Sequence, residues 1–374
     1  YQISYYLKIL MKSYSGKIFI GTMSGTSHDG IDICSVSITN KKIELLNFGS
    51  YKYPNSLRKD ISNVIQHQKL SLNKYIELDK KIGIAFGKSI NRFLVKNKIN
   101  KNQILAIGLS GQTLFHAPKH KYPFSIQAGD PKIVSMECCL DVVSDFRNDH
   151  INLGGEGAPL VPEFHQKIFA RKNSSLFILN IGGISNFTFL DGKKSFYGSD
   201  CGPGNALMDA YCQTSLNLPY DKNGDLAKNG KVHHQALKKM LSHPFFKKRH
   251  PKSTGKEVFN IKFIPKELLK KSPNDILATL NELTAISIAK SLHAQNKLPE
   301  QMIICGGGIK NRFLINSIKK HTKIGLVSSS EFGLDPQAIE AMAFGWMASQ
   351  RIYKNLLFVK EKKGLLGKIT RSIQ

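Results

Sequence analysis

Residues 198–209 read GSDCGPGNALMD, in which an acid ends a predicted strand and a Gly-Pro-Gly turn leads into a predicted helix. Small and apolar side chains follow at helical spacing, so that one stripe can face a core; they are Leu207, Ala210, Tyr211 and Thr214. Pro203 suits the first helical turn because its φ is already set. Asp200, held on this rigid support, is the candidate base, although a helix-capping or turn aspartate also fits the pattern.

Composition bounds the class of protein. With 374 residues, 41% of them apolar, the chain can bury a large core and make two domains. The net charge of +27 comes mainly from scattered lysines, whereas tight phosphate or base recognition usually recruits arginine. We therefore expect no specific nucleic-acid partner. Six cysteines without CxxC pairing predict a reduced, cytoplasmic compartment, and no apolar run approaches a membrane span.

A first glycine-rich turn, GTMSGTSHDG at residues 21–30, lies between predicted strands at 17–20 and 31–38. It presents several backbone N–H groups and hydroxyls to one point, which suits a phosphate chain. A plain hairpin needs only two turn residues. The turn is neither a Walker A loop nor a GxGxxG motif. A purely structural loop remains the alternative.

The second half repeats this arrangement. A predicted strand at 176–181 leads into Gly182-Gly183 and a returning strand at 184–189. Further on, the predicted strand 302–305 runs into three glycines at 306–308, which would let a flat ring lie on bare backbone. A tight strand–helix turn explains the three glycines equally well.

Polar segments also follow the predicted strands of the first half. Residues 110–116, 127–131 and 145–149 lie where α/β folds place ligand sites. Arg147, flanked by acids and followed by a glycine run at 154–157, suits a polar substrate that bears a carboxylate. The same residues also fit a surface salt bridge.

Taken in order, these segments resemble the anhydro-N-acetylmuramic acid kinase family, within the sugar-kinase/Hsp70/actin superfamily. The resemblance covers about residues 17–350. The matching blocks are GTMSGTSHDGID at 21–32, GQT at 111–113 with His116, Gln127 with Gly129-Asp130, DFR at 145–147, GAPLVP at 157–162, NIGGISN at 180–186, GPGN at 202–205 and STG at 253–255.

The resemblance implies an α/β fold of two actin/Hsp70-like (RNase H-like) domains, whose mixed β-sheets clasp ATP in the cleft between them. Domain I would comprise residues 17–170 and 337–358, and domain II residues 171–336. Residues 1–16 would be a tail, and the lysine-rich residues 359–374 are predicted to be a loose tail as well. Family kinship also suggests a homodimer.

The implied activity is ATP-dependent conversion of 1,6-anhydro-N-acetylmuramic acid to N-acetylmuramic acid 6-phosphate, with hydrolytic opening of the anhydro ring, in cell-wall amino-sugar recycling. Asp200 would be the catalytic base. The ATP and phosphate ligands would be Gly21, Ser24, Gly25, Thr26, Ser27, Asp29, Gly30, Asp32, Gly182, Gly183, Ser185, Asn186, Gly306, Gly307, Gly308 and Asn311. The substrate ligands would be Gln112, His116, Asp130, Arg147, Asp149, Glu156, Gly202, Asn205 and Glu340. Mg²⁺ would be held through the ATP phosphates and not by a direct protein site.

Four positions depart from the family pattern: Ser110 replaces His, Glu156 replaces Gln, Cys201 replaces Thr, and His28 replaces an aliphatic residue. Glu156 places a carboxylate near an acidic substrate, which lowers affinity unless that carboxylate is protonated or paired. Three other functions stay open at this point. They are another sugar or small-acid kinase of the superfamily acting on a free hydroxyl, an Hsp70-type binding protein, and a lysine-rich polyanion binder.

Overall fold

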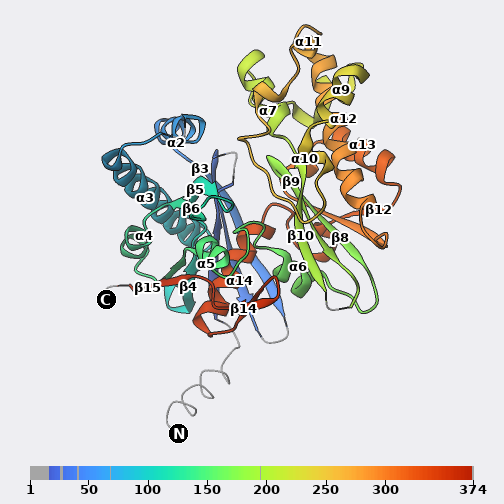
Figure 1. The fold of residues 1–374 in the computed structure, drawn as a ribbon. Helices are drawn as coiled ribbons and strands as arrows, with labels where there is room; N and C mark the ends of the chain where they lie inside the picture. The colour runs from blue at the N-terminus through green and yellow to red at the C-terminus, as the bar shows by residue number, and fades with distance from the viewer. Residues whose placement is uncertain (1–16, 26–27, 40–41, 68, 194, 373–374) are drawn as a thin grey trace. The chain divides into compact units, whose positions relative to one another are not determined.

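The protein is described by a computed structural model covering residues 17–25, 28–39, 42–67, 69–193 and 195–372; the predicted tail at 1–16 lies outside the described residues. The chain divides into two compact units (Figure 1). Unit 1 contains the described residues up to Leu160 together with those from Ala338, and unit 2 contains Val161–Gln337. The first change of unit therefore falls before helix α6 (Pro162–Phe169), earlier than the predicted boundary at 170/171.

Unit 1 is built on a six-stranded sheet with the order β15-β7-β4-β1-β2-β3. Strands β1, β2 and β3 are antiparallel neighbours, whereas β1, β4 and β7 run parallel. The elements of unit 1 are β1 (Ile18–Met23), β2 (Gly30–Ile38), β3 (Ile43–Lys52), α2 (Asn55–His67), α3 (Leu72–Lys96), η1 (Lys101–Gln103), β4 (Ile104–Gly108), β5 (Gln112–Ala117), β6 (Phe124–Ala128), α4 (Pro131–Cys138), β7 (Val142–Ser144), α5 (Phe146–Asn152), α14 (Ile339–Ile352), β13 (Leu357–Val359), β14 (Lys362–Gly364) and β15 (Lys368–Thr370).

Unit 2 carries a five-stranded sheet with the order β10-β9-β8-β11-β12. Strands β8, β9 and β10 are antiparallel, and β8, β11 and β12 are parallel. Its elements after α6 are β8 (Leu176–Ile181), β9 (Ile184–Leu190), β10 (Phe196–Pro203), α7 (Ala206–Ser215), η2 (Lys222–Gly224), α8 (Asp225–Lys228), α9 (His234–Leu241), α10 (Pro244–Lys247), η3 (Ile261–Phe263), α11 (Lys266–Leu269), α12 (Pro273–His293), β11 (Gln301–Cys305), η4 (Gly307–Lys310), α13 (Arg312–Thr322), β12 (Gly325–Ser328) and η5 (Ser329–Phe332).

The two sheets share one topology. Five strands of each sheet, numbered in chain order, lie in the order 3-2-1-4-5, with an antiparallel meander on one side and parallel strands on the other. Helices connect the parallel strands, as a crossover between parallel strands requires. The predicted α/β class, with mixed sheets of the actin/Hsp70 type, is confirmed.

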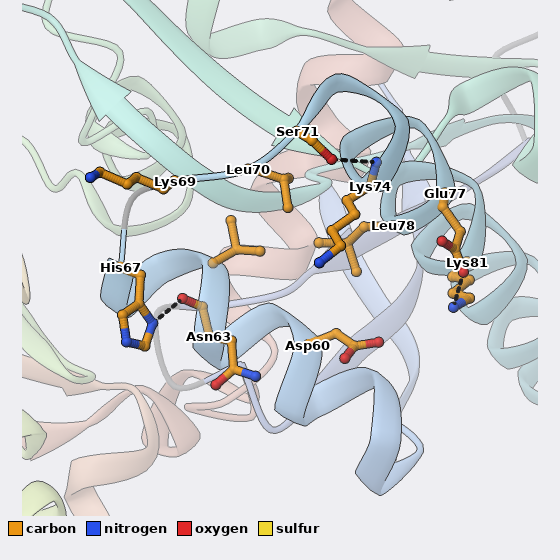
Figure 2. A pocket seen from close by; sticks show the side chains of 11 residues that line it. Asp60, Asn63, His67, Lys69, Leu70, Ser71, Lys74, Glu77, Leu78 and Lys81 are labelled. Carbon is orange, nitrogen blue, oxygen red and sulfur yellow. Dashed lines mark hydrogen bonds and ion pairs between the residues drawn. The ribbon is translucent and has the colours of Figure 1, made fainter.

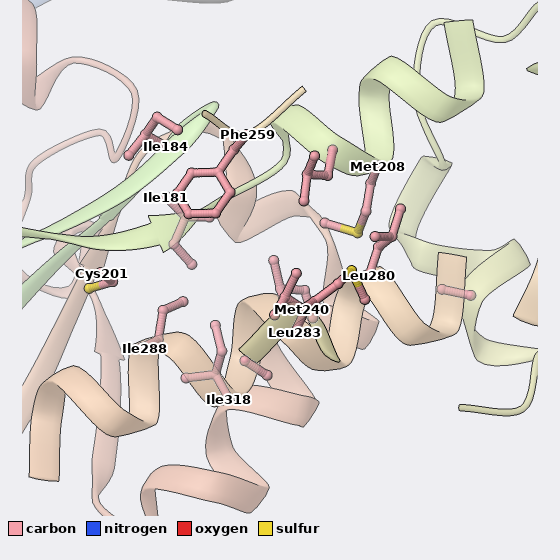
Figure 3. Packing of buried hydrophobic residues seen from close by; sticks show 14 of the residues in the cluster. Ile181, Ile184, Cys201, Met208, Met240, Phe259, Leu280, Leu283, Ile288 and Ile318 are labelled. Carbon is pink, nitrogen blue, oxygen red and sulfur yellow. The ribbon is translucent and has the colours of Figure 1, made fainter. Parts of the chain in front are cut away.

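The core of unit 2 shows why its sheet is rigid. All six residues of β8 are buried, as expected for a strand covered on both faces. In α12, Ile276, Leu280 and Leu283 are also buried, and Figure 3 shows Leu280 and Leu283 packed toward Met240. This core supports β10, the strand that carries Asp200.

The prediction of a loose C-terminal tail at 359–374 is wrong for the residues that the structure describes. Strand β15 pairs with β7 at the edge of the unit 1 sheet, and β13 pairs with β14. Leu366 is 4% exposed, and Lys368 forms an ion pair with Asp145, with Nζ 2.6 Å from Oδ2. Buried apolar side chains and ion pairs thus hold this segment in place, although its lysine content predicted a loose tail.

His165 of α6 makes the stability of unit 2 sensitive to acid. Its side chain is 1% exposed, and Nδ1 lies 2.8 Å from Thr188 Oγ1 on β9. Burial lowers the pKa of His165 to about 3, so folding favours the neutral ring. This contribution to stability is complete above the usual histidine pKa and is lost as the pH falls from about 6.5 toward 3.

We therefore expect His165→Gln to reduce the loss of unfolding free energy between pH 7 and pH 5 by about 2 kcal/mol. Urea unfolding at several pH values measures this loss. Substitution of surface His67 by Gln is the control and should leave the pH dependence unchanged. An unchanged slope for His165→Gln would show that the buried ring does not resist protonation.

Candidate active site

The turn after β8 is bound to the start of α7. The amide of Gly204 donates to Gly183 O and that of Asn205 to Gly182 O, both at 2.9 Å. A Cβ on Gly204 would overlap Gly182 O, so this close approach requires glycine. Pro203 is the last residue of β10 and precedes Asn205, the N-cap of α7, so it lies near the first helical turn but outside it.

Asp200 lies at a β-bulge. It pairs with Asn186 on β9, and the register then shifts so that Gly202, with φ of +146°, pairs with Ser185. Bulges change the direction of a side chain and are common beside active sites. Asp200 is 9% exposed, and its carboxylate Oδ2 accepts the Thr254 amide at 2.8 Å.

We call residues 250–254 the strap, because this segment runs beside β10 and is bound to it. The amide of Asp200 donates to Lys252 O, and the Lys252 amide donates to Ser199 Oγ, both at 2.9 Å. His250 Nδ1 lies 2.6 Å from the same hydroxyl. The strap therefore fixes both the main chain and the carboxylate of Asp200.

Lys252 anchors the strap. It is 8% exposed, and its ammonium donates to Phe245 O at 3.2 Å and Lys248 O at 3.3 Å, the carbonyls at the end of α10. Nζ also lies 4.6 Å from the centroid of the Phe245 ring. Burial lowers the pKa of Lys252, and the Asp200 carboxylate opposes that shift. These contacts tie the strap to α10.

Two residues beside Asp200 support the site and do not face a ligand. Ser185 is fully buried, and its hydroxyl donates at 3.2 Å to the carbonyls of Gly202 and Pro203. We therefore revise its predicted phosphate contact to a structural role. Cys201 is fully buried as well, and burial raises the pKa of its thiol to about 12. This departure from the family pattern is accommodated in the core.

The three glycines after β11 have different roles. A Cβ on Gly306 would overlap Asn180 Oδ1, and one on Gly308 would overlap the Ile181 side chain. Around Gly307, no described residue other than its chain neighbours lies within 4 Å of such a Cβ. Packing thus requires Gly306 and Gly308, while Gly307 alone has the open space that the predicted ATP contact needs.

Asn311 caps helix α13. Its side-chain oxygen accepts the Leu314 amide at 3.0 Å, and the residue is 9% exposed. This is the usual role of an asparagine at a helix N-terminus. We revise its predicted ATP contact accordingly.

Ser24 and Gln112 form the base of the first glycine turn in unit 1. Ser24 Oγ donates to Gln112 Oε1 at 2.7 Å, and its amide donates to Ser110 Oγ at 3.1 Å. Gln112 is fully buried and Ser24 is 3% exposed. Both therefore shape the turn, in place of the predicted substrate and phosphate contacts. The Ser110 departure is explained, because its hydroxyl completes this network.

Other residues of this turn divide into buried and open positions. A Cβ on Gly21 would overlap Ala341 O of α14, and one on Gly30 would overlap Tyr51 O. By contrast, no described residue other than its chain neighbours lies within 4 Å of such a Cβ on Gly25. His28 Nε2 lies 2.7 Å from Ser62 Oγ, which ties the turn to α2. The predicted ligands Thr26 and Ser27 lie outside the described residues.

Two acids flank the open turn. Asp29 is exposed, and its backbone carbonyl accepts the Tyr53 amide at 3.2 Å. Asp32, on β2, accepts a hydrogen bond from Ser50 Oγ. Neither position conflicts with the predicted phosphate site, which stays a prediction.

Arg147 is the strongest polar candidate in unit 1. One guanidinium nitrogen donates to Gly157 O at 2.8 Å, while Nε is buried without a hydrogen-bond partner among the described residues. Burial lowers the pKa of Arg147, and the Glu340 carboxylate opposes that shift. Arginine stays charged in proteins, so this cation can receive an anionic or polar group.

His116 and Glu156 lie near Arg147. His116 Nδ1 is 3.0 Å from Ser125 Oγ, and desolvation together with the Arg147 charge lowers its pKa. The residue retains exposed surface, which limits the size of that effect. Glu156 forms an ion pair with Lys119 at 3.4 Å. A lysine partner thus reduces the repulsion that the Gln-to-Glu departure would otherwise impose on an acidic substrate.

Two predicted substrate ligands hold the fold together. Asp130 caps α4 by accepting the Lys132 amide at 2.8 Å. Asp149 accepts the Gly367 amide at 2.8 Å and so binds the C-terminal segment. We revise both to structural roles.

Sequence reasoning missed Thr254 and Lys252 as neighbours of Asp200. The STG block at 253–255 matched the family motif, but nothing in its spacing indicates that Thr254 contacts Asp200, which lies 54 positions earlier in the chain. Asp79 was also missed. Its Oδ1 accepts the Gly129 amide at 2.7 Å, and burial raises its pKa.

A separate groove of about 610 Å³ lies between α2 and α3 (Figure 2). Its walls carry charges of both signs, including the Lys81–Glu77 ion pair, and it contains none of the predicted site residues. Among the described residues, no group of three or more His, Cys, Asp or Glu side chains is placed to hold a metal ion. None of the described helices has the length and apolar character needed to cross a membrane.

Two mixed sheets of one topology, each with a glycine turn after its first strand, define the class of actin-like ATPases and sugar kinases. The sequence model of the anhydro-N-acetylmuramic acid kinase family matches residues 17–357. The chain belongs to that family. It is therefore an ATP-dependent phosphotransferase.

Individual relatives agree over nearly the whole length. The chain is 49% identical to the anhydro-N-acetylmuramic acid kinase of Gamma-proteobacterium EBAC31A08, over 96% of this chain and 99% of the relative. It is 39% identical to that of Pasteurella multocida, over 89% and 90%. Among solved structures, it is similar to the activator of 2-hydroxyisocaproyl-CoA dehydratase from Clostridium difficile with bound ADPNP, with TM-score 0.47, 10% identity, and coverage of 92% and 99%.

Proposed function

We propose that the protein converts 1,6-anhydro-N-acetylmuramic acid, ATP and water to N-acetylmuramic acid 6-phosphate and ADP. Family membership supports the substrate. The observation that carries the chemistry is Asp200, a carboxylate at a bulge whose Oδ2 is held by the Thr254 amide. A fixed carboxylate near a reacting water is the arrangement that general-base catalysis requires.

The substrate explains why a base is needed. Its O6 is bonded to C1 in the anhydro bridge, so there is no free hydroxyl to phosphorylate. Asp200 accepts a proton from water as the water oxygen bonds to C1. The C1–O6 bond breaks, O6 attacks the γ-phosphorus of ATP, and ADP leaves with the β–γ bridging oxygen.

The proposed binding groups are the predicted site residues to which the structure assigns no structural role of their own. We propose that Gly25, Asp29, Asp32, Gly182, Gly183, Asn186 and Gly307 contact ATP, and that Arg147, His116, Glu156, Gly202, Asn205 and Glu340 contact the sugar. Arg147 suits the lactyl carboxylate because its Nε is buried without a partner among the described residues. Mg²⁺ bound to ATP would neutralise charge on the transferred phosphoryl group.

Product analysis tests this function. Purified protein with ATP, Mg²⁺ and the anhydro sugar should give a product heavier by the elements of one phosphoryl unit (HPO₃) and one water. Early proton NMR should show a single C1 anomer, as expected for direct attack of water on C1. Phosphorylation of ordinary N-acetylmuramic acid, without turnover of the anhydro sugar, would instead favour a kinase that acts on a free hydroxyl.

We also propose that the protein is a cytoplasmic homodimer. Six free cysteines, five of them buried, support a reducing compartment. Light scattering coupled to size-exclusion chromatography would measure the oligomeric state.

A further inference from the structure

The side chain of Thr254 ends in an unexplained polar atom beside Asp200. Its Oγ1 is buried and has no hydrogen-bond partner within the part of the chain that the structure describes. Buried hydroxyls are normally paired, and each exception needs a physical reason. Valine has the same shape and would fill this position without an unsatisfied group. Because this hydroxyl lies on the residue whose amide binds the Asp200 carboxylate, it points to a partner that is not part of the chain.

The position of the hydroxyl relative to Asp200 follows from covalent geometry. The amide of the same residue donates to Asp200 Oδ2 at 2.8 Å. The hydroxyl is joined to that amide nitrogen through Cα and Cβ, so it lies only a few ångströms from the carboxylate, a separation of the kind that a single water bridges. A carboxylate accepts several hydrogen bonds, so the Thr254 amide does not use its full capacity.

The strap holds Thr254 and Asp200 in fixed positions relative to each other. Lys252 O accepts the Asp200 amide, and the Lys252 amide donates to Ser199 Oγ, both at 2.9 Å. The buried ammonium of Lys252 fastens the strap to two carbonyls at the end of α10. Thr254 is therefore held against Asp200 by a built support, as a catalytic constellation requires.

We propose that Thr254 Oγ1 is the second hydrogen-bond partner of the water that Asp200 deprotonates. This inference rests on the proposed function. One hydrogen of the water is directed to the Asp200 carboxylate and is transferred to it. The other is donated to Thr254 Oγ1, which leaves a lone pair of the water oxygen directed at C1. The C–O bond then forms as the C1–O6 bond breaks.

The test compares Thr254→Val with Thr254→Ser. Both variants keep the amide that binds Asp200, but only serine keeps the hydroxyl. We expect Thr254→Val to lower kcat by about 10- to 100-fold, with both KM values within about threefold and thermal stability equal to or above the wild type. We expect Thr254→Ser to retain most of the kcat.

Ser175→Ala is the matched control. The Ser175 hydroxyl is also buried without a partner among the described residues, but Ser175 directly precedes β8, and its amide donates to Glu300 Oε1 at 3.4 Å. We expect Ser175→Ala to keep full kcat and full stability. A merely structural role for Thr254 would make the two variants behave alike.

The outcomes separate the two claims. Full kcat in Thr254→Val, with a wild type that converts the anhydro sugar, would overturn the role of Thr254 alone. Equal losses of kcat in Thr254→Val and Thr254→Ser, with lowered stability, would also overturn it. A wild type that fails to convert the anhydro sugar would overturn the proposed function and this inference together.

Discussion

Asp200→Asn is expected to lower kcat by about 10²–10⁴-fold, the usual contribution of a general base, while ATP still binds. Asparagine has nearly the size of aspartate, and its carbonyl oxygen can still accept the Thr254 amide, so the strap keeps its place. It cannot accept the proton of the attacking water. ADP release in the presence of the anhydro sugar measures kcat, and calorimetry measures ATP affinity.

Asp221 offers the matched control. It is 6% exposed and accepts the amides of Leu226 and Ala227 at 3.0 Å, so it is a buried, amide-bound acid like Asp200. We expect Asp221→Asn to lower the free energy of unfolding by about 1–3 kcal/mol and to retain kcat. A kcat within tenfold of the wild type in Asp200→Asn would rule out Asp200 as the base.

The fold could be predicted where local signals and the family resemblance agreed. The sequence predicts one strand before Gly182-Gly183 and a returning strand after it, and the structure places β8 and β9 there. The mixed character of the sheets came from the resemblance, because the pairing of β1 with β4 joins segments far apart in the chain. The C-terminal strands escaped prediction because three-residue strands carry almost no periodicity.

The sequence predicted which motifs form the candidate site, but it predicted less well which individual side chains of those motifs face a ligand. Asp200 stood out because an acid before a Gly-Pro-Gly turn is a local pattern. Ser24, Ser185 and Gln112 belong to matching motifs, yet their polar groups are satisfied within the protein. Whether a polar side chain faces inward or toward a ligand depends on partners distant in sequence, and a single sequence does not contain that information.

Gly21 and Gly25 show the same distinction within one turn and lead to opposite expectations. A Cβ on Gly21 would overlap Ala341 O and lie 2.7 Å from Gly345 N, both in the backbone of α14. Neither the buried strand nor the helix can yield, so Gly21→Ala should lower the free energy of unfolding by about 1–3 kcal/mol or more. Because proteins are marginally stable, this is a large fraction of the total. Chemical denaturation measures the loss.

Gly25→Ala should leave stability unchanged or slightly raised, because no described residue other than its chain neighbours lies within 4 Å of the added Cβ and alanine restricts the unfolded chain. The same variant should bind ATP more weakly. If ATP phosphates approach the bare backbone at Gly25, the added methyl group should raise the KM for ATP roughly tenfold, which corresponds to about 1.4 kcal/mol of lost binding free energy. Steady-state kinetics at saturating sugar measure this effect. An unchanged KM would remove Gly25 from the ATP site, and a stable Gly21→Ala protein would show that α14 does not pack closely on β1.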